Sequence, residues 1–311
     1  MANPAEEPFF PPSPDAGGPP DAVRQRQEEA RARCQGTPQE IAERYGLSAE
    51  EARDCTGAFD DLLHLDRHKA GLSRLVRLGP KAGRFLLDQL ESCTPEQSEA
   101  RPHFITEALC QCLNPQVEAD LAELLKERLL RVELRQFAIV ALAHGGEAAS
   151  KELLVELFCR YVQRDRDQRE PLMFRALALA MDSLKDARAV PGLTRVIAEE
   201  RRSSSIDLVM AAIGALGEIG DDRAIAPLRK LAKNRQRWQL APQVCLALAR
   251  LNDAKAAALA RAARARQYNW TAWQLELFDE VERLCPEEPR KKKKKGEAED
   301  QNSQHEEGSD A

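Results

Sequence analysis

Aromatic residues are scarce in this chain of 311 residues, since Phe, Trp and Tyr together make up only 5% of it. Sandwiches and barrels draw on aromatic and β-branched residues for their strands, so the scarcity argues against an all-β fold. No run of apolar residues approaches the roughly 18 that a transmembrane helix needs, which excludes a spanning helix. The charged fraction is 31% and the hydrophobic fraction 43%, a balance typical of helical proteins in water. We therefore predict an all-α protein with no membrane partner.

No secretory signal or transit peptide is recognised at the N-terminus. The chain begins with an acidic, proline-rich segment, which is neither a secretory signal nor a transit peptide. Four of the eight cysteines, Cys110, Cys112, Cys159 and Cys245, fall within apolar helical patterns. We expect reduced, buried thiols in a reducing compartment, and hence a cytoplasmic protein. A nuclear location is the alternative in an organism with a nucleus, because Arg290–Lys295 resembles a basic import signal.

Neither end of the chain has a composition that supports a core. Residues 1–22 contain seven prolines and two glycines. Residues 286–311 contain six consecutive positive charges, followed by six acidic residues among polar ones. Such segments bury too little apolar area to offset the entropy of ordering them. We predict disordered tails at 1–22 and 286–311.

A repeated pattern occupies the middle of the chain. In the segment Ala211–Leu228, an apolar helix runs to Ile219, Gly220-Asp221 interrupts it, and a second helix follows. Glycine suits the left-handed residue that ends a helix, and Asp221 or Asp222 suits the N-cap of the next one. The same frame recurs at intervals of 32 to 39 residues. With Leu216 as the reference, the equivalent positions are Leu75, Leu109, Leu142, Met181 and Leu248. Six such units predict a repeat array.

These units resemble the HEAT repeat, and in particular the short HEAT-like repeat first associated with phycobilin lyases. The resemblance covers residues 70–266 and is most specific at Ala211–Leu228. It implies a right-handed α-solenoid of about six helix pairs, with the second helix of each pair on the concave side. Stacked pairs share a continuous core that one pair cannot make alone.

Helical caps are expected at both ends of the array. We predict N-terminal capping helices over 23–69 and a C-terminal capping helix over 267–285. The closing helix should carry one apolar stripe made of Trp270, Trp273, Leu277, Val281 and Leu284.

The segment Gln39–Arg53 resembles a helix-turn-helix, with the turn at Gly46-Leu47-Ser48. The would-be recognition helix begins Ala49-Glu50-Glu51, which would bring carboxylates against phosphates. An ordinary capping hairpin is favoured.

Recognisable catalytic motifs are lacking. Gly214, Gly217 and Gly220 follow no strand and precede no Gly-Lys-Ser/Thr, so we attribute them to close helix packing. His64 and His68 are four residues apart on an expected helix, but neither a Glu after His64 nor a third ligand at a diagnostic spacing accompanies them. The chain has a single His-Glu pair, His305-Glu306, whereas the HEAT-like metal hydroxylases use repeated ones. We predict no catalytic residue, no cofactor and no metal.

Positive charge is concentrated between residues 223 and 266. That stretch carries eleven Lys and Arg residues and one acid, Asp253, for a net charge of +10 against −15 for the rest of the chain. We expect it to form a basic concave surface accompanied by Trp238, Tyr268, Trp270 and Trp273, which is what an anionic partner requires. The predicted partner-binding residues are Arg223, Arg229, Lys230, Lys233, Arg235, Arg237, Lys255, Arg261, Arg264 and Arg266.

The sequence thus predicts a non-enzymatic scaffold that binds an acidic segment of a partner protein. A nucleic-acid-associated solenoid is the alternative reading of the same charges. A HEAT-like lyase, or another enzyme with a site built from scattered residues, is the third.

Overall fold

Helices account for all the regular structure in the described part of the chain. The computed structural model describes residues 20–94, 96–98, 100–164, 170–199, 206–266 and 269–286, and no strand occurs among them. The prediction of an all-α fold is confirmed. Residues 1–19 and 287–311, which hold most of the two predicted tails, lie outside the described residues, together with Arg290–Lys295 and His305-Glu306.

The α-helices and short 3₁₀ helices (η) are, in chain order, α1 (Pro20–Cys34), α2 (Pro38–Tyr45), α3 (Ala49–Leu62), α4 (His68–Leu78), α5 (Pro80–Glu91), α6 (Ala100–Gln111), α7 (Pro115–Lys126), α8 (Val132–His144), α9 (Ala148–Gln163), α10 (Pro171–Leu184), η2 (Ala187–Ala189), α11 (Val190–Glu199), α12 (Ile206–Ile219), η4 (Asp222–Ala224), α13 (Ile225–Ala232), η5 (Arg235–Leu240), α14 (Ala241–Arg250), α15 (Ala256–Arg264) and α16 (Ala272–Leu284).

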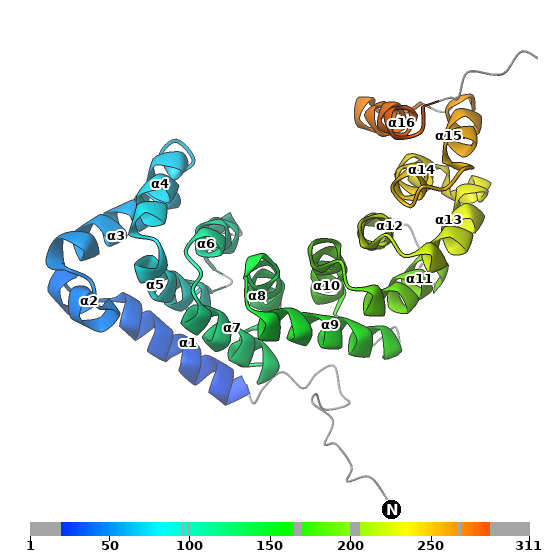
Figure 1. Cartoon of the computed structure of the whole chain (residues 1–311). Helices are drawn as coiled ribbons and strands as arrows, with labels where there is room; N and C mark the ends of the chain where they lie inside the picture. Colours follow the sequence, from blue (N-terminus) through cyan, green and yellow to red (C-terminus); the bar gives the residue numbers. More distant parts are fainter. Residues whose placement is uncertain are drawn as a thin grey trace, which may run out of the picture.

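The helices form an arc of two layers (Figure 1). Helices α6, α8, α10, α12, α14 and α16 line the inner side of the arc, and α7, α9, α11, α13 and α15 lie outside them. Successive inner helices contact one another more extensively than successive outer helices do. The hydrophobic core runs between the two layers along the whole arc.

Local sequence signals explain the N-terminal helices. Thr37 and Ser48 each begin a helix with a capping box, in which they exchange hydrogen bonds with Glu40 and Glu51 respectively. Gly46, with φ of 64°, ends α2 between them. Two helices joined by a turn at Gly46-Leu47-Ser48 therefore occupy the segment 39–53. Helix α1 begins at Pro20, so the last three residues of the expected N-terminal tail are helical.

All six repeat reference positions are fully buried. Each lies near the end of a helix that begins a pair, in α4, α6, α8, α10, α12 or α14. These residues are Leu75, Leu109, Leu142, Met181, Leu216 and Leu248, each at 0% exposure.

The last three of these helices end in the same kind of turn. The turns are Lys185-Asp186, Gly220-Asp221 and Asn252-Asp253. The first residue of each has a left-handed φ, of 52°, 76° and 55° in chain order. The aspartate that follows accepts a hydrogen bond from the backbone N–H two residues later, at 2.8, 2.9 and 3.0 Å. The predicted roles of Gly220 and Asp221 are therefore confirmed.

The expectation that the second helix of each pair lines the concave side is wrong. Helices α13 and α15, which carry much of the basic stretch, lie on the outer layer (Figure 1). The first helices of successive units pack more extensively on one another than the second helices do, which fits the inner side of the curve, where neighbouring helices lie closest. A Cβ on Gly217 of α12 would lie 2.9 Å from the Cα of Ala247 in α14. This close approach is local, because small residues do not mark the inner layer as a whole: the outer helix α15 contains six alanines among its nine residues.

The expected apolar stripe of the closing helix is also wrong in part. Thr271 caps α16, so Trp270 precedes the helix instead of belonging to it. Val281 is buried together with Phe278, which the predicted stripe omitted. Trp273 is 48% exposed and Leu284 46% exposed, so neither closes the core.

Candidate functional site: the basic outer face

The predicted partner-binding residues fall into two groups, which differ in whether a carboxylate of this chain already holds the cation. The side chain of Arg235 lies outside the part that the structure describes, as does Tyr268. The remaining nine residues lie in or beside η4, α13, η5 and α15. Helices α13 and α15 belong to the outer layer of the arc (Figure 1).

Arg229 is bound to the one acid of the basic stretch. Its Nε donates to Oδ2 of Asp253 at 2.7 Å, and its Nη2 donates to Oδ1. The side chain of Asp253 is fully buried and also accepts from the backbone N–H of Lys255. The hydrogen bond from Arg229 lowers the pKa of Asp253 below its usual range. Arg229 therefore joins α13 to the turn before α15, and its guanidinium group already has a carboxylate partner within the chain.

Two further arginines are held in a similar way. Arg223 binds Asp221 at 2.7 Å and donates to the backbone oxygen of Ala187 in the preceding unit. Arg264 binds two carboxylates of α16, Asp279 at 2.7 Å and Glu282 at 3.3 Å. These contacts connect neighbouring helices, so part of the positive charge of the stretch is compensated within the chain.

Other cations of the stretch lack such a carboxylate. Among the described residues, no carboxylate lies within 4 Å of the charged groups of four of these cations, Lys230, Lys233, Lys255 and Arg266. Lys230, Lys233 and Lys255 are exposed on the outer surface. They are the part of the predicted basic surface that is open to an anionic partner.

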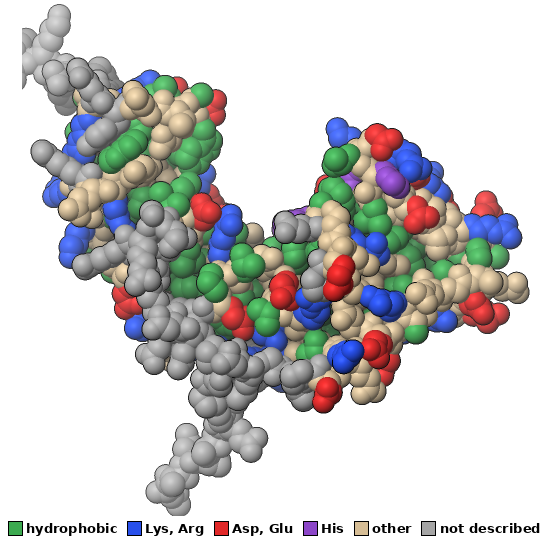
Figure 2. Space-filling view, turned by 180° about the vertical axis from the view of Figure 1, so that it is seen from behind, with side chains coloured by type: hydrophobic (Ala, Val, Ile, Leu, Met, Phe, Trp, Pro, Cys, Tyr) green, Lys and Arg blue, Asp and Glu red, His purple; other side chains and the backbone are tan. Residues whose placement is uncertain are grey.

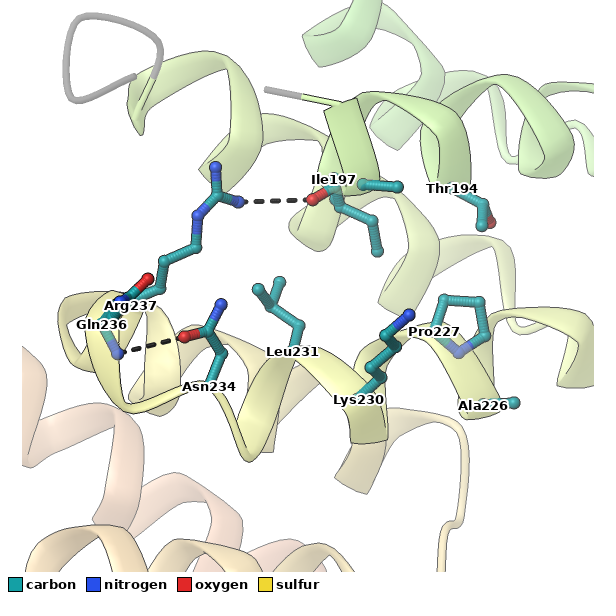
Figure 3. Close-up of a pocket in the computed structure, with 10 residues that line it drawn as sticks. Thr194, Ile197, Ala226, Pro227, Lys230, Leu231, Asn234, Gln236 and Arg237 are labelled. Atoms are coloured by element: carbon teal, nitrogen blue, oxygen red, sulfur yellow. Dashed lines mark hydrogen bonds between the residues drawn. The ribbon is translucent and has the colours of Figure 1, made fainter. Parts of the chain in front are cut away.

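A groove lies beside this surface, between α11 and α13 (Figure 3). It has a volume of about 810 Å³. Its apolar lining includes Ile197, Pro227 and Leu231, and its cations are Lys230 and Arg237. Arg237 reaches across it and donates to the backbone oxygen of Ile197 at 3.3 Å. The groove therefore combines an apolar floor with positive charge at two points, 230 and 237.

The aromatic residues do not join the basic surface as expected. The indole rings of Trp238 and Trp270 are edge to face with centroids 5.3 Å apart, and Trp270 packs against Phe278 in the same way at 5.2 Å. Trp273 lies instead in a hollow with residues of α10, α12 and α14. Trp238 and Trp270 thus close the C-terminal core.

A second groove, on the inner side of the arc, was missed from the sequence. It has a volume of about 490 Å³ and lies among α6, α8 and α10. Leu172 and Leu179, at 51% and 46% exposure, belong to its lining. Figure 2 shows the molecule hollowed between its two ends, with hydrophobic side chains on the walls of the hollow. The signal was the seven-residue spacing of the two leucines, which puts both on one face of α10.

His64 and His68, which the sequence places four residues apart, do not share a helix. Helix α4 begins at His68, and His64 lies in the turn before it. The imidazole of His68 instead contacts the backbone oxygen of Leu62 at 2.8 Å and Oε2 of Glu107 at 3.0 Å. No group of three His, Cys, Asp or Glu side chains that could hold a metal ion is found in the described ranges.

No family model matches the chain, and a search of curated proteins finds no significant match. The eight cysteines are all free thiols. None of the helices within the described residues is both long enough and apolar enough to cross a membrane.

Proposed function

We propose that this protein is a non-enzymatic scaffold that binds an acidic segment of a partner protein in the groove between α11 and α13. The groove lies in a right-handed solenoid of six HEAT-like helix pairs, α4–α5 to α14–α15, with α1–α3 and α16 as caps. The buried reference residue in each pair and the shared design of the last three turns support this architecture. The protein works in the cytoplasm and uses no cofactor.

The observation that carries the function is the composition of the groove. Leu231 of α13 and Ile197 of α11 lie between the ammonium group of Lys230 and the guanidinium group of Arg237 (Figure 3). Apolar side chains of a peptide gain free energy by leaving water for such a floor, and carboxylates beside them meet the two cations. The groove therefore fits a segment in which acidic and apolar residues are mixed.

The lysines beside the groove assist peptide binding through long-range electrostatic attraction. Lys233 and Lys255 extend the positive surface beyond the groove and have no compensating carboxylate among the described residues. A field of one sign speeds the encounter with an acidic partner more than it strengthens the final complex.

Nucleic acid is the less favoured partner. Proteins that track single strands stack bases on exposed aromatic rings. No aromatic side chain is among the described residues that line the groove, and Trp238 and Trp270 pack on each other. Arg223, Arg229 and Arg264 are already paired with carboxylates, so fewer cations remain to contact phosphates.

The test compares two charge reversals and one steric variant in the full-length chain. Lys230→Glu changes the charge inside the groove, and Lys255→Glu makes the same change outside it. Ala226→Phe fills the groove without altering charge, because Ala226 is an exposed residue of the lining. The probe is a fluorescent twelve-residue peptide of aspartates with two leucines, and its affinity is measured by anisotropy.

We expect Lys230→Glu and Ala226→Phe each to weaken peptide binding by about tenfold or more, equivalent to about 1.4 kcal/mol. Lys255→Glu should change mainly the association rate. Equal losses from Lys230→Glu and Lys255→Glu, or none from Ala226→Phe, would show that charge alone attracts the peptide and that the groove is not the site. Tight binding of a single-stranded oligonucleotide, with a steep dependence on salt, would favour nucleic acid instead.

A further inference from the structure

Helix α1 is held on the rest of the molecule with very little apolar burial. It packs mainly against α5, at the end of the arc opposite the basic groove (Figure 1). Of its described side chains only Ala30 is buried. The hydrophobic effect, which holds most helices in place, therefore contributes little here.

Ion pairs and hydrogen bonds, rather than apolar burial, hold α1 on α5. Arg26 Nε lies 3.0 Å from Oε2 of Glu91, and Arg33 Nη2 lies 2.9 Å from Oδ1 of Asp88. Gln27 donates to the backbone oxygen of Cys93 at 2.5 Å. The two arginines are seven residues apart, two helical turns, and so point the same way. Both carboxylates are almost completely buried beneath them, with side chains 0% and 2% exposed.

The contact is not fully satisfied. Arg33 Nε and Glu91 Oε1 are buried without a hydrogen-bond partner in the structure. Burial also raises the pKa of Glu91, which means that this carboxylate loses hydration when α1 covers it. Of these two atoms, Arg33 Nε leaves with α1, whereas Glu91 Oε1 stays on α5, so another helix with a donor that reaches Glu91 gains a hydrogen bond that α1 leaves unmade.

The connection to α2 makes such an exchange feasible. Only Gln35, Gly36 and the capping residue Thr37 separate the two helices, and Gly36 has a φ of 140°. Thr37 begins α2 with its own capping box, so α2 does not depend on α1 for its start.

We propose that this face of α5, formed by Asp88, Glu91 and the backbone oxygen of Cys93, is a docking surface for a helix that carries two arginines seven residues apart. Helix α1 occupies it until a partner helix of that kind replaces it. Guanidinium groups suit the surface because they present several planar donors to a carboxylate, which a lysine ammonium group does not. The proposal concerns a different face from the groove and does not depend on it.

Release of α1 is measured through Cys34, its last residue. Burial, with Asp88 as a further cause, raises the pKa of this thiol to about 12 and so protects it from alkylation. In the full-length chain, the double variant Arg26→Ala/Arg33→Ala should raise the rate of Cys34 alkylation by iodoacetamide about tenfold, equivalent to about 1.4 kcal/mol. Mass spectrometry of the peptides assigns the label to each cysteine.

The matched control is Arg24→Ala/Arg31→Ala on the same helix. These arginines are exposed, are also seven residues apart, and make no ion pair with α5 in the structure. Cys55, whose thiol pKa burial also raises to about 12, reports any general unfolding. The proposal is overturned if the two double variants label Cys34 at the same rate. In the wild-type chain, salt should speed labelling of Cys34 and not of Cys55, because it screens the ion pairs; equal acceleration or none would also overturn it.

Docking of a second helix is tested with a fluorescent, end-capped peptide of residues 20–34. It should bind the full-length Arg26→Ala/Arg33→Ala chain saturably and the wild-type chain more weakly, because α1 competes in the latter. Replacing both of these arginines in the peptide by lysine, or adding Glu91→Gln to the chain, should weaken binding about tenfold. No binding to the Arg26→Ala/Arg33→Ala chain, or equal binding by the lysine peptide, would refute the docking surface.

Discussion

Two glycines of α12 offer a matched test of how closely the inner helices pack. Gly214 and Gly217 lie three residues apart on the same helix, and both face α14. A Cβ on Gly217 would meet the Cα of Ala247 at 2.9 Å and its Cβ at 3.1 Å. A Cβ on Gly214 would come no closer than 3.6 Å, to the flexible end of Gln243. Replacing glycine by alanine therefore overpacks the contact at Gly217, whereas the added methyl group fits at Gly214.

The magnitudes follow from two effects. Replacing glycine by alanine inside a helix stabilises it by about 0.8–1 kcal/mol, and both positions receive that gain. Forcing an extra methyl group into a packed contact costs about 1–3 kcal/mol, and only Gly217 incurs that cost, because a helix backbone cannot move aside cheaply. We expect Gly214→Ala to raise the free energy of unfolding by up to about 1 kcal/mol. Gly217→Ala should fall about 1–3 kcal/mol below Gly214→Ala.

Urea unfolding followed by far-ultraviolet circular dichroism measures both free energies. Because a stack of helices can open at one joint, hydrogen exchange of the α14 amides gives a second reading at that joint. Equal stabilisation by the two substitutions would show that α12 and α14 are not in close contact at Gly217.

Three further predictions concern the core, the turns and the thiols. Leu216→Ala should cost about 2–5 kcal/mol, measured by the same urea unfolding, because Leu216 is fully buried; a near-neutral effect would contradict its role as a repeat reference. Asp253 has a lowered pKa in the folded protein, so its contribution to stability should be complete well above about pH 4, the value of an unperturbed aspartate, and be lost as the pH falls further through the lowered pKa of the folded state, whereas Asp253→Asn should flatten this part of the thermal-midpoint profile. A profile of unchanged slope would refute the role of its ion pair. Burial raises the pKa of the Cys245 thiol to about 12, so in native protein it should resist alkylation until the chain unfolds; fast labelling under native conditions would contradict its place in the core.

The repeat frame could be found from the sequence because it depends on short-range physics. A left-handed residue followed by a capping aspartate leaves a local signature, and Gly220-Asp221 carries it most clearly. Once that turn was recognised, counting along the chain located Leu75 and Leu248, both of which are fully buried. Turns of this kind can be recognised from the local sequence, without knowing which distant residues are in contact.

The layer that each helix joins could not be found in the same way. An alternation of two helices is the same pattern whichever of them lies inside the curve. Of the three glycines in Ala211–Leu228 that were attributed to close packing, only Gly217 lies in a tight contact, whereas Gly220 ends the helix with a left-handed φ. Small residues do not identify the inner helix either, because the outer helix α15 is the richest in alanine.

The basic stretch illustrates why a count of charges overstates a binding surface. Its single acid, Asp253, is fully buried and holds Arg229, so the residue that looked like an exception in the sequence is the one that fixes the turn before α15. An acid retained in a stretch of net charge +10 is therefore better interpreted as a structural partner of a cation than as a gap in the surface.

The arginines and lysines of the basic stretch differ in their contacts. The arginines at 223, 229 and 264 bind carboxylates of their own chain, whereas Lys230, Lys233 and Lys255 bind none of the carboxylates that the structure describes. Guanidinium groups suit fixed contacts between helices, and flexible ammonium groups remain in water until an anionic partner arrives.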